Sequence, residues 1–197
     1  MVKHFLNLGS IVWLRSSSSV LSLAQAQCSS LITLGTPHTS PESALVDQTR
    51  GLLREIAESA SCSPRTLSED LGVDITCVCS SSLSGDILGS GASRNRPSTN
   101  VLESVVALSS YLPLLGRVGA DVAGDGIVPL ELAFMDEPAR RVEVSECEIT
   151  GNPVRHSHVV PTPWNLWNGY APSIVLPDDF CSYISPGVLS QWAKHIK

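Results

Sequence analysis

From residue 31 onward the chain alternates between strand-type and helix-type segments, and this alternation constrains the fold more than any other feature. Short stretches rich in apolar residues are separated by longer segments in which apolar residues recur at three- and four-residue spacing. The expected strands are 31–34, 73–79 and 141–144, and the expected helices are 47–60, 101–112 and 186–196. This order predicts an α/β sandwich with a mostly parallel sheet.

The composition of individual segments refines this prediction. Segment 73–79 is almost continuously apolar, which is typical of a parallel strand buried on both faces. Segment 141–144 alternates charged and apolar residues, so we expect it nearer a sheet edge. Pro113 is expected to end the helix 101–112, because proline has no N–H to donate within a helix. Segment 80–99 is rich in Ser and Gly and is expected to be irregular.

Net charge and hydropathy exclude several partner classes. The 13 Lys and Arg against 19 Asp and Glu give a formal charge of −6, so the basic surface that attracts nucleic-acid phosphates is not expected. No apolar run approaches the roughly 18 to 20 residues that cross a bilayer, so no transmembrane segment is expected. A chain of 197 residues is long enough for one domain with its own core.

The cysteines do not form a recognisable framework. None of their spacings repeats as paired CxxC motifs, so we expect buried thiols in a reducing compartment, with metal ligation or a disulfide as the alternatives. The strand 73–79 places two of them on one face. The six are Cys28, Cys62, Cys77, Cys79, Cys147 and Cys181.

The first 28 residues form a divergent segment with its own character. Residues 1–41 contain two strong charges, Lys3 and Arg15, and the first acidic residue is Glu42. This composition is compatible with a signal peptide, with an organelle transit peptide, or with a helix over 11–27 that leads into the first strand. The compartments favoured are a plastid or the cytoplasm, with the secretory pathway as the alternative.

Two loops carry residues suited to chemistry. Asp125 lies between two glycines in the loop 124–129, where a sharp turn presents its carboxylate. His156 and His158 lie in the later loop 155–158. An acid after one strand and a histidine after the next can pair so that the carboxylate orients the imidazole for general-base work. The alternatives are that Asp125 caps a turn and that each histidine is an ordinary surface residue.

Five motifs, taken in order, resemble the C-terminal half of plant α/β-hydrolase superfamily proteins, which are lipase-like enzymes related to GPI inositol-deacylases. The resemblance covers about 29–196 and implies a partial domain with a lid-like insertion over 80–124, its three strands being the last three of an eight-stranded sheet. It also implies that Asp125 is the triad acid and His156 the base, with His158 as the second choice. The motifs are Leu31-Ile-Thr-Leu-Gly-Thr-Pro-His38, Thr49-Arg-Gly-Leu-Leu53, Gly124-Asp-Gly-Ile-Val-Pro129, His156-Ser157 and Pro186-Gly-Val-Leu-Ser-Gln-Trp192.

The nucleophile is where the sequence departs from this family. The family pattern places a Gly-x-Ser-x-Gly pentapeptide before the strand 31–34, and the chain contains none. Ser10, in Gly9-Ser10, is the nearest candidate, but Ile11 and Val12 follow it where small residues are needed. We therefore expect a truncated or alternatively started product in which 1–28 replace the catalytic N-terminal half.

The resemblance implies a function for the complete enzyme. That function is hydrolysis of a carboxylic ester, with a lipid or other acyl substrate, by a Ser-His-Asp mechanism that needs no metal and no organic cofactor. This chain retains the acid and the base but not the expected serine, so we expect it to be inactive alone. The alternative is a non-catalytic pseudoenzyme or interaction fragment that pairs with other chains through the strand from Leu31 to Leu34.

Overall fold

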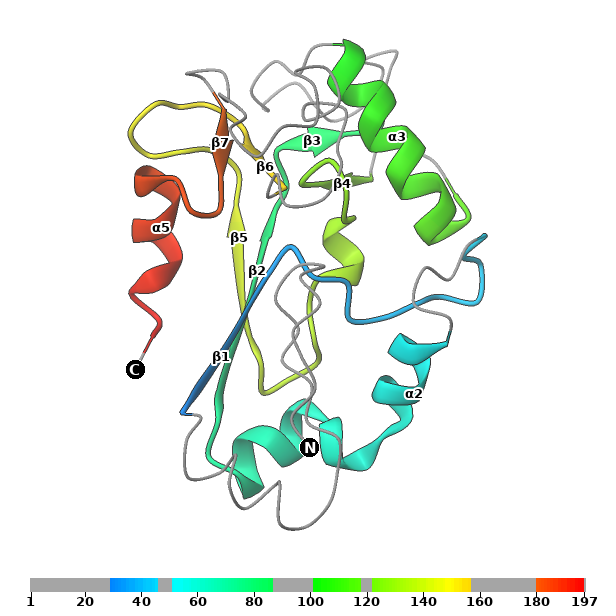
Figure 1. Ribbon diagram of the computed structural model, residues 1–197, viewed down its shortest axis with the longest axis vertical. Helices are drawn as coiled ribbons and strands as arrows, with labels where there is room; N and C mark the ends of the chain where they lie inside the picture. Colours follow the sequence, from blue (N-terminus) through cyan, green and yellow to red (C-terminus); the bar gives the residue numbers. More distant parts are fainter. Residues whose placement is uncertain (1–28, 46–50, 87–100, 118–121, 157–179, 197) are drawn as a thin grey trace, which may run out of the picture.

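The computed structural model describes residues 29–45, 51–86, 101–117, 122–156 and 180–196. Its centre is a parallel sheet of three strands in the order β1-β2-β5 (Figure 1), with Leu31 opposite Ile75 and Cys77 opposite Arg141. The described helices and mostly parallel strands are those of an α/β protein, as the sequence predicted. The sheet strands are β1 (Ser30–Leu34), β2 (Asp74–Ser80) and β5 (Arg140–Val144).

Two pairs of short strands lie beyond the carboxyl ends of the sheet, towards the top of Figure 1. The strands β3 (Leu83–Ser84) and β4 (Ala123–Gly124) are antiparallel, and β6 (Val154–Arg155) and β7 (Cys181–Ser182) are parallel. Part of the segment expected to be irregular is therefore ordered, and 87–99 lies outside the described residues. Asp125 directly follows β4 and His156 directly follows β6, so these short strands position the two candidate residues.

Serine side chains explain why this serine-rich stretch is ordered. Ser80 Oγ donates a hydrogen bond to the carbonyl oxygen of Val154 at 2.7 Å, and the Val154 N–H donates to Ser82 Oγ at 2.8 Å. Ser82 Oγ also donates to the carbonyl oxygen of Ser145. Because these hydroxyls satisfy buried backbone groups, they fix the start of β6 against the end of β2.

The helices lie around the three-stranded sheet (Figure 1). The described part of the first expected helix is α2 (Leu52–Glu58), since 46–50 lie outside the described residues. It leads through a 3₁₀ turn, η1 (Ala60–Cys62), and a π-helical turn, η2 (Thr66–Asp70), into β2. The remaining helical elements are α3 (Val101–Leu115), the 3₁₀ turn η4 (Leu130–Leu132) and α5 (Pro186–Ala193).

The prediction that Pro113 ends a helix is wrong. Helix α3 continues through Pro113 to Leu115 and ends at Gly116, whose φ of 68° is left-handed and whose N–H donates to the Leu112 carbonyl oxygen at 2.8 Å. Proline removes one helical hydrogen bond. Tyr111 and Leu115 are 1% and 3% exposed, and their burial on either side of Pro113 outweighs that loss.

The core confirms that β2 is buried on both faces. Val78 packs with Val144, Val188 and Trp192 in the cluster that α5 covers. Cys77 and Cys79, on the opposite face, are each fully buried in separate clusters. All the described cysteines are free thiols, and Cys28 lies outside the described residues.

Among the described residues, no helix is long and apolar enough to cross a membrane. The same part of the chain contains no group of three or more His, Cys, Asp or Glu side chains arranged to hold a metal ion.

Candidate active site

The structure brings Asp125 and His156 together. Asp125 follows β4 and His156 follows β6, and Asp125 Oδ2 lies 2.8 Å from His156 Nδ1. A second bond joins their backbones, because the His156 N–H donates to the Asp125 carbonyl oxygen at 2.9 Å. Asp125 is fully buried and His156 is 4% exposed. The expected proximity of the two side chains is confirmed, and their catalytic role stays a prediction.

The two oxygens of Asp125 have different tasks. Oδ1 accepts hydrogen bonds from the backbone N–H groups of Ile127 at 3.0 Å and Val128 at 2.7 Å, as an aspartate that caps a turn does. Oδ2 faces the imidazole of His156. The turn-capping role and the acid–histidine contact, which the sequence left as alternatives, are therefore combined in one side chain. The turn holds the carboxylate in place for its other partner.

Tyr183, next to β7, is a member of this centre that the sequence did not reveal. Its hydroxyl donates to Asp125 Oδ2 at 2.8 Å and accepts from the N–H of Ser80, the last residue of β2, at 2.9 Å. Burial and the neighbouring Asp125 charge raise the pKa of Tyr183 well above its ordinary value, so the phenol keeps its proton. A tyrosine 27 residues after the histidine belongs to no motif or period, so no sequence signal identified it.

Gly35, at the carboxyl end of β1, packs directly against the side chains of Asp125, His156 and Tyr183. A β-carbon on Gly35 would lie 2.2 Å from Asp125 Oδ2 and 2.9 Å from both His156 Nδ1 and a ring carbon of Tyr183. Its φ of +54° is also in the left-handed region, which glycine adopts without strain. The glycine that closes the first expected strand is therefore required by the site. The site lies at the carboxyl end of the sheet, where an α/β fold places its chemistry.

The Asp125 carboxylate controls the protonation of His156. Burial alone would lower the pKa of the imidazole, but the charge of Asp125 and its hydrogen bond to Nδ1 outweigh burial and raise that pKa above its ordinary value. Because Nδ1 is held by Asp125, Nε2 is the nitrogen through which the ring would exchange a proton with a reacting group.

A buried ion pair holds Arg155, the residue before the histidine. Arg155 Nε donates to Glu103 Oε1 at 2.6 Å, and the two side chains are 9% and 6% exposed. The Arg155 guanidinium also lies 5.6 Å from the centre of the Phe180 ring. Since Glu103 belongs to the first turn of α3, this pair ties the residue before His156 to that helix. Nothing in the sequence predicts a role for Arg155 or Glu103, because their pairing spans 52 positions.

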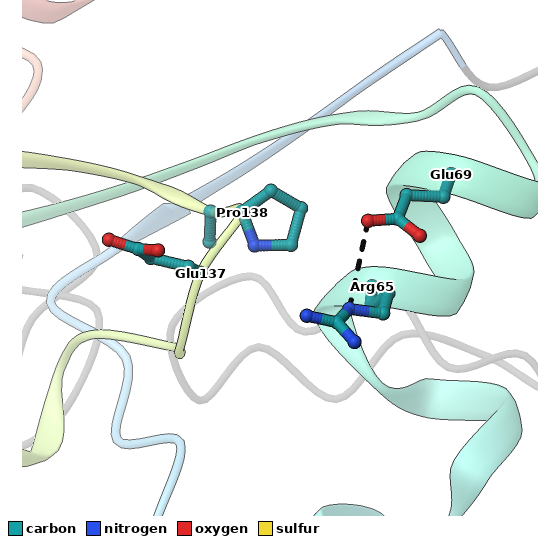
Figure 2. Close-up of a pocket in the computed structure, with 5 residues that line it drawn as sticks. Arg65, Glu69, Glu137 and Pro138 are labelled. Carbon is teal, nitrogen blue, oxygen red and sulfur yellow. Dashed lines mark ion pairs between the residues drawn. The ribbon is translucent and has the colours of Figure 1, made fainter.

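The other candidates lie outside the described residues or outside the site. Ser10 and His158 belong to the former group. His38 lies outside the site, where its Nε2 is 3.0 Å from Thr33 Oγ1 of β1. Burial lowers the pKa of His38 to about 4. A surface hollow of about 390 Å³ lies elsewhere, at η2 and the segment before β5. In Figure 2, Arg65 and Glu69 lie side by side on one helical segment and form an ion pair, while Pro138 lies across from them and Glu137 points away.

Comparisons with protein-family models, with curated proteins and with solved structures found no match to this chain.

Proposed function

We propose that Asp125 and His156 are the acid and the base of a Ser-His-Asp site that hydrolyses carboxylic esters in the complete α/β-hydrolase-type enzyme. The observation that carries this proposal is the buried contact of 2.8 Å between Asp125 Oδ2 and His156 Nδ1. A carboxylate in this position selects the tautomer whose Nε2 accepts a proton, and it stabilises the imidazolium that results. The resemblance of the surrounding motifs to lipase-like proteins supports an acyl substrate with a lipid or other ester group.

The proposed reaction proceeds through an acyl-enzyme. A serine hydroxyl gives its proton to His156 Nε2 while its oxygen attacks the ester carbonyl carbon, and the imidazolium then protonates the departing alcohol. Water repeats the same steps, releases the carboxylic acid and restores the serine. The Tyr183 hydroxyl donates to Asp125 Oδ2 and is itself held by the Ser80 N–H, so the carboxylate keeps its position as the charge on His156 changes.

The serine is supplied by sequence other than the described residues in this proposal. The chain contains no Gly-x-Ser-x-Gly pentapeptide, and Ser10 is the nearest candidate in its sequence. We therefore expect the 197-residue chain alone to show negligible hydrolysis of p-nitrophenyl esters and no labelling by a fluorophosphonate probe. A monodisperse monomer whose ester turnover is lost in Ser10→Ala would contradict this expectation and make Ser10 the nucleophile.

The test of the function uses a longer product in which an in-frame upstream segment supplies the Gly-x-Ser-x-Gly serine. His156→Ala should lower its kcat on p-nitrophenyl butyrate by about a thousandfold or more, because the general base is lost. His158→Ala is the matched control and should keep most of the activity. The reverse result would move the base to His158. Unchanged activity in both variants would refute the proposed mechanism.

A non-catalytic role has one observation in its favour. Within the described residues, β1 forms one edge of the three-stranded sheet, and its apolar residues are only partly buried. Unprotected strand edges can pair with strands of other chains. As the alternative function we propose that copies of this chain associate through the strand from Leu31 to Leu34. Sedimentation velocity over a range of concentrations tests it. A chain that stays monomeric at all concentrations would exclude pairing through β1.

A further inference from the structure

Two buried thiols lie together outside the acid–histidine site. Cys147 belongs to the loop between β5 and β6, and Cys181 is the first residue of β7. Thr150 Oγ1 lies 3.3 Å from Cys181 Sγ. Thr150 and the two thiols also shift one another's pKa values, as polar groups in close proximity do. Both cysteines belong to the cluster that packs under α5, where they are 2% and 3% exposed.

The backbone, and not a single rotamer, holds this pair together. The loop folds back on itself, because the Cys147 N–H donates to the Asn152 carbonyl oxygen at 2.9 Å and a bridge joins Glu146 to Pro153. Immediately afterwards, Val154 pairs with Cys181 in the parallel β6–β7 ladder. Figure 1 shows the loop beside β7 and the start of α5. Two adjoining hydrogen-bond networks therefore fix the separation of the two cysteines.

The surroundings of the pair favour reaction at Cys147. Cys147 is buried, but it lies in a loop whose other residues, 145, 146 and 148–151, are exposed. Burial raises the pKa of Cys147, but hydrogen bonds from Thr150, from backbone N–H groups and from Cys181 outweigh it and lower the pKa. Burial is the largest cause that raises the pKa of Cys181. The more acidic thiol is the better source of the reactive thiolate.

We propose that Cys147 and Cys181 are a redox modification site that forms a reversible intramolecular disulfide with hydrogen peroxide as the oxidant. The Cys147 thiolate attacks one peroxide oxygen, so an S–O bond forms, the O–O bond breaks and hydroxide leaves. The Cys181 thiol then attacks the Cys147 sulfur, so the S–S bond forms and the S–O bond breaks. The second oxygen leaves as water, and the proton first lost by Cys147 neutralises the hydroxide. Two thiols are oxidised and one peroxide is reduced to two waters.

The disulfide would act on the region of the acid–histidine site without taking part in its chemistry. It closes the loop from 147 to 181, which contains His156, and it anchors β7 two residues before Tyr183. This proposal does not depend on the proposed ester hydrolysis.

The test is peptide mapping of the folded chain after peroxide treatment, with remaining thiols alkylated under denaturing conditions. Trypsin cuts after Arg141, Arg155 and Lys194, so Cys147 and Cys181 fall in the separate peptides 142–155 and 156–194. We expect these two peptides to be joined, with the mass of two hydrogens lost, and to separate after dithiothreitol. Oxidised chain should also unfold at a higher urea concentration than reduced chain, because the closed loop restricts the unfolded state.

Matched variants distinguish this pair from other thiols. Cys147→Ser should abolish the joined peptides, whereas Cys62→Ser, at a partly exposed cysteine, should leave them unchanged. The wild-type map tests the proposal even if Cys147→Ser fails to fold. The proposal is overturned if both cysteines remain alkylated when Cys62 is already oxidised. It is equally overturned if Cys147 accumulates as sulfinic acid without the joined peptides.

Discussion

The acid–histidine centre and the surface hollow each pair a carboxylate with a basic side chain, and they differ in how the two groups are held. In the centre, Asp125 and His156 are 0% and 5% exposed at their side chains and lie 2.8 Å apart. In the hollow, Arg65 Nε and Glu69 Oε1 are 3.6 Å apart on one turn of helix, with side chains 76% and 62% exposed. Water and salt weaken the second pair much more than the first. The exposed charges of the hollow are therefore held less firmly than the buried pair, and the acid–histidine centre is the better candidate for a functional site.

The two regions also differ in how many parts of the chain they need. Arg65 and Glu69 are four positions apart in one helical segment. The centre needs Gly35 after β1, Ser80 at the end of β2, Asp125 after β4, His156 after β6 and Tyr183 after β7. A site assembled from five places in the fold is sensitive to small displacements, which is a property of precise chemical sites. The difference can be tested by substitutions matched between the regions.

The largest expected effect is that of Gly35→Ala. The added carbon would lie 2.2 Å from Asp125 Oδ2, and alanine at φ +54° is strained as well. We expect the free energy of unfolding to fall by about 4 kcal/mol, from the strain and the overlap together. Urea unfolding followed by circular dichroism measures this loss.

Gly72→Ala is the matched control for backbone strain. Its φ is +69°, but nothing lies within 4 Å of the added carbon. We expect a cost of about 1 kcal/mol, from the left-handed backbone alone. Equal losses at the two glycines would show that Gly35 does not lie against the Asp125 carboxylate.

The second prediction compares carboxylates of the two kinds of pair. Glu103→Gln should lower the free energy of unfolding by about 3 kcal/mol, because it leaves the buried Arg155 guanidinium without a charged partner. Glu69→Gln should change it by less than about 0.5 kcal/mol, because the pair with Arg65 is solvated. Similar values from urea titrations of the two variants would contradict the contrast between buried and exposed pairs.

The third prediction concerns Tyr183→Phe. Loss of the hydroxyl removes a donor to Asp125 and leaves the Ser80 N–H without its partner, so we expect a loss of about 2 kcal/mol. With less of its charge neutralised, Asp125 should raise the pKa of His156 further, as measured by NMR titration of the imidazole protons. Tyr111→Phe is the control, since that buried hydroxyl accepts from the Gly126 N–H and donates to the Leu83 carbonyl oxygen. An unchanged pKa in Tyr183→Phe would refute the coupling.

Local patterns in the sequence predicted the parts of the fold that local physics determines. Continuous apolar character in 73–79 identified β2, which is buried on both faces, and alternating charge at 141–144 identified β5, an edge of the described sheet. The prediction that the helix ends at Pro113 was wrong, because the burial of Tyr111 and Leu115 depends on tertiary packing. The strands β3, β4, β6 and β7 have two residues each, too few to show a period.

The candidate site shows the same limit. Asp125 was identifiable because glycines flank it, and His156 and His158 because they lie in the loop after a predicted strand. The resemblance at His156-Ser157 then favoured His156 over His158. Tyr183, Glu103 and Arg155 act through contacts that span 52 or more positions, and nothing in their neighbourhoods marks them. Their roles depend on how β6, β7 and α3 meet, which a single sequence does not specify.

The smallest expected effect is a difference in pH dependence between two buried histidines. The pKa of His156 is raised by Asp125, so its contribution to stability is full below the ordinary histidine pKa of about 6.5 and is lost as pH rises through the folded value. The pKa of His38 is lowered to about 4 by burial, so its contribution is present above about 6.5 and is lost as pH falls towards 4. Asp125→Asn should lower the pKa of His156 and leave that of His38 unchanged in NMR titrations. If His156 instead titrates below His38, or does not respond to Asp125→Asn, the carboxylate does not control the imidazole and the acid–histidine assignment fails.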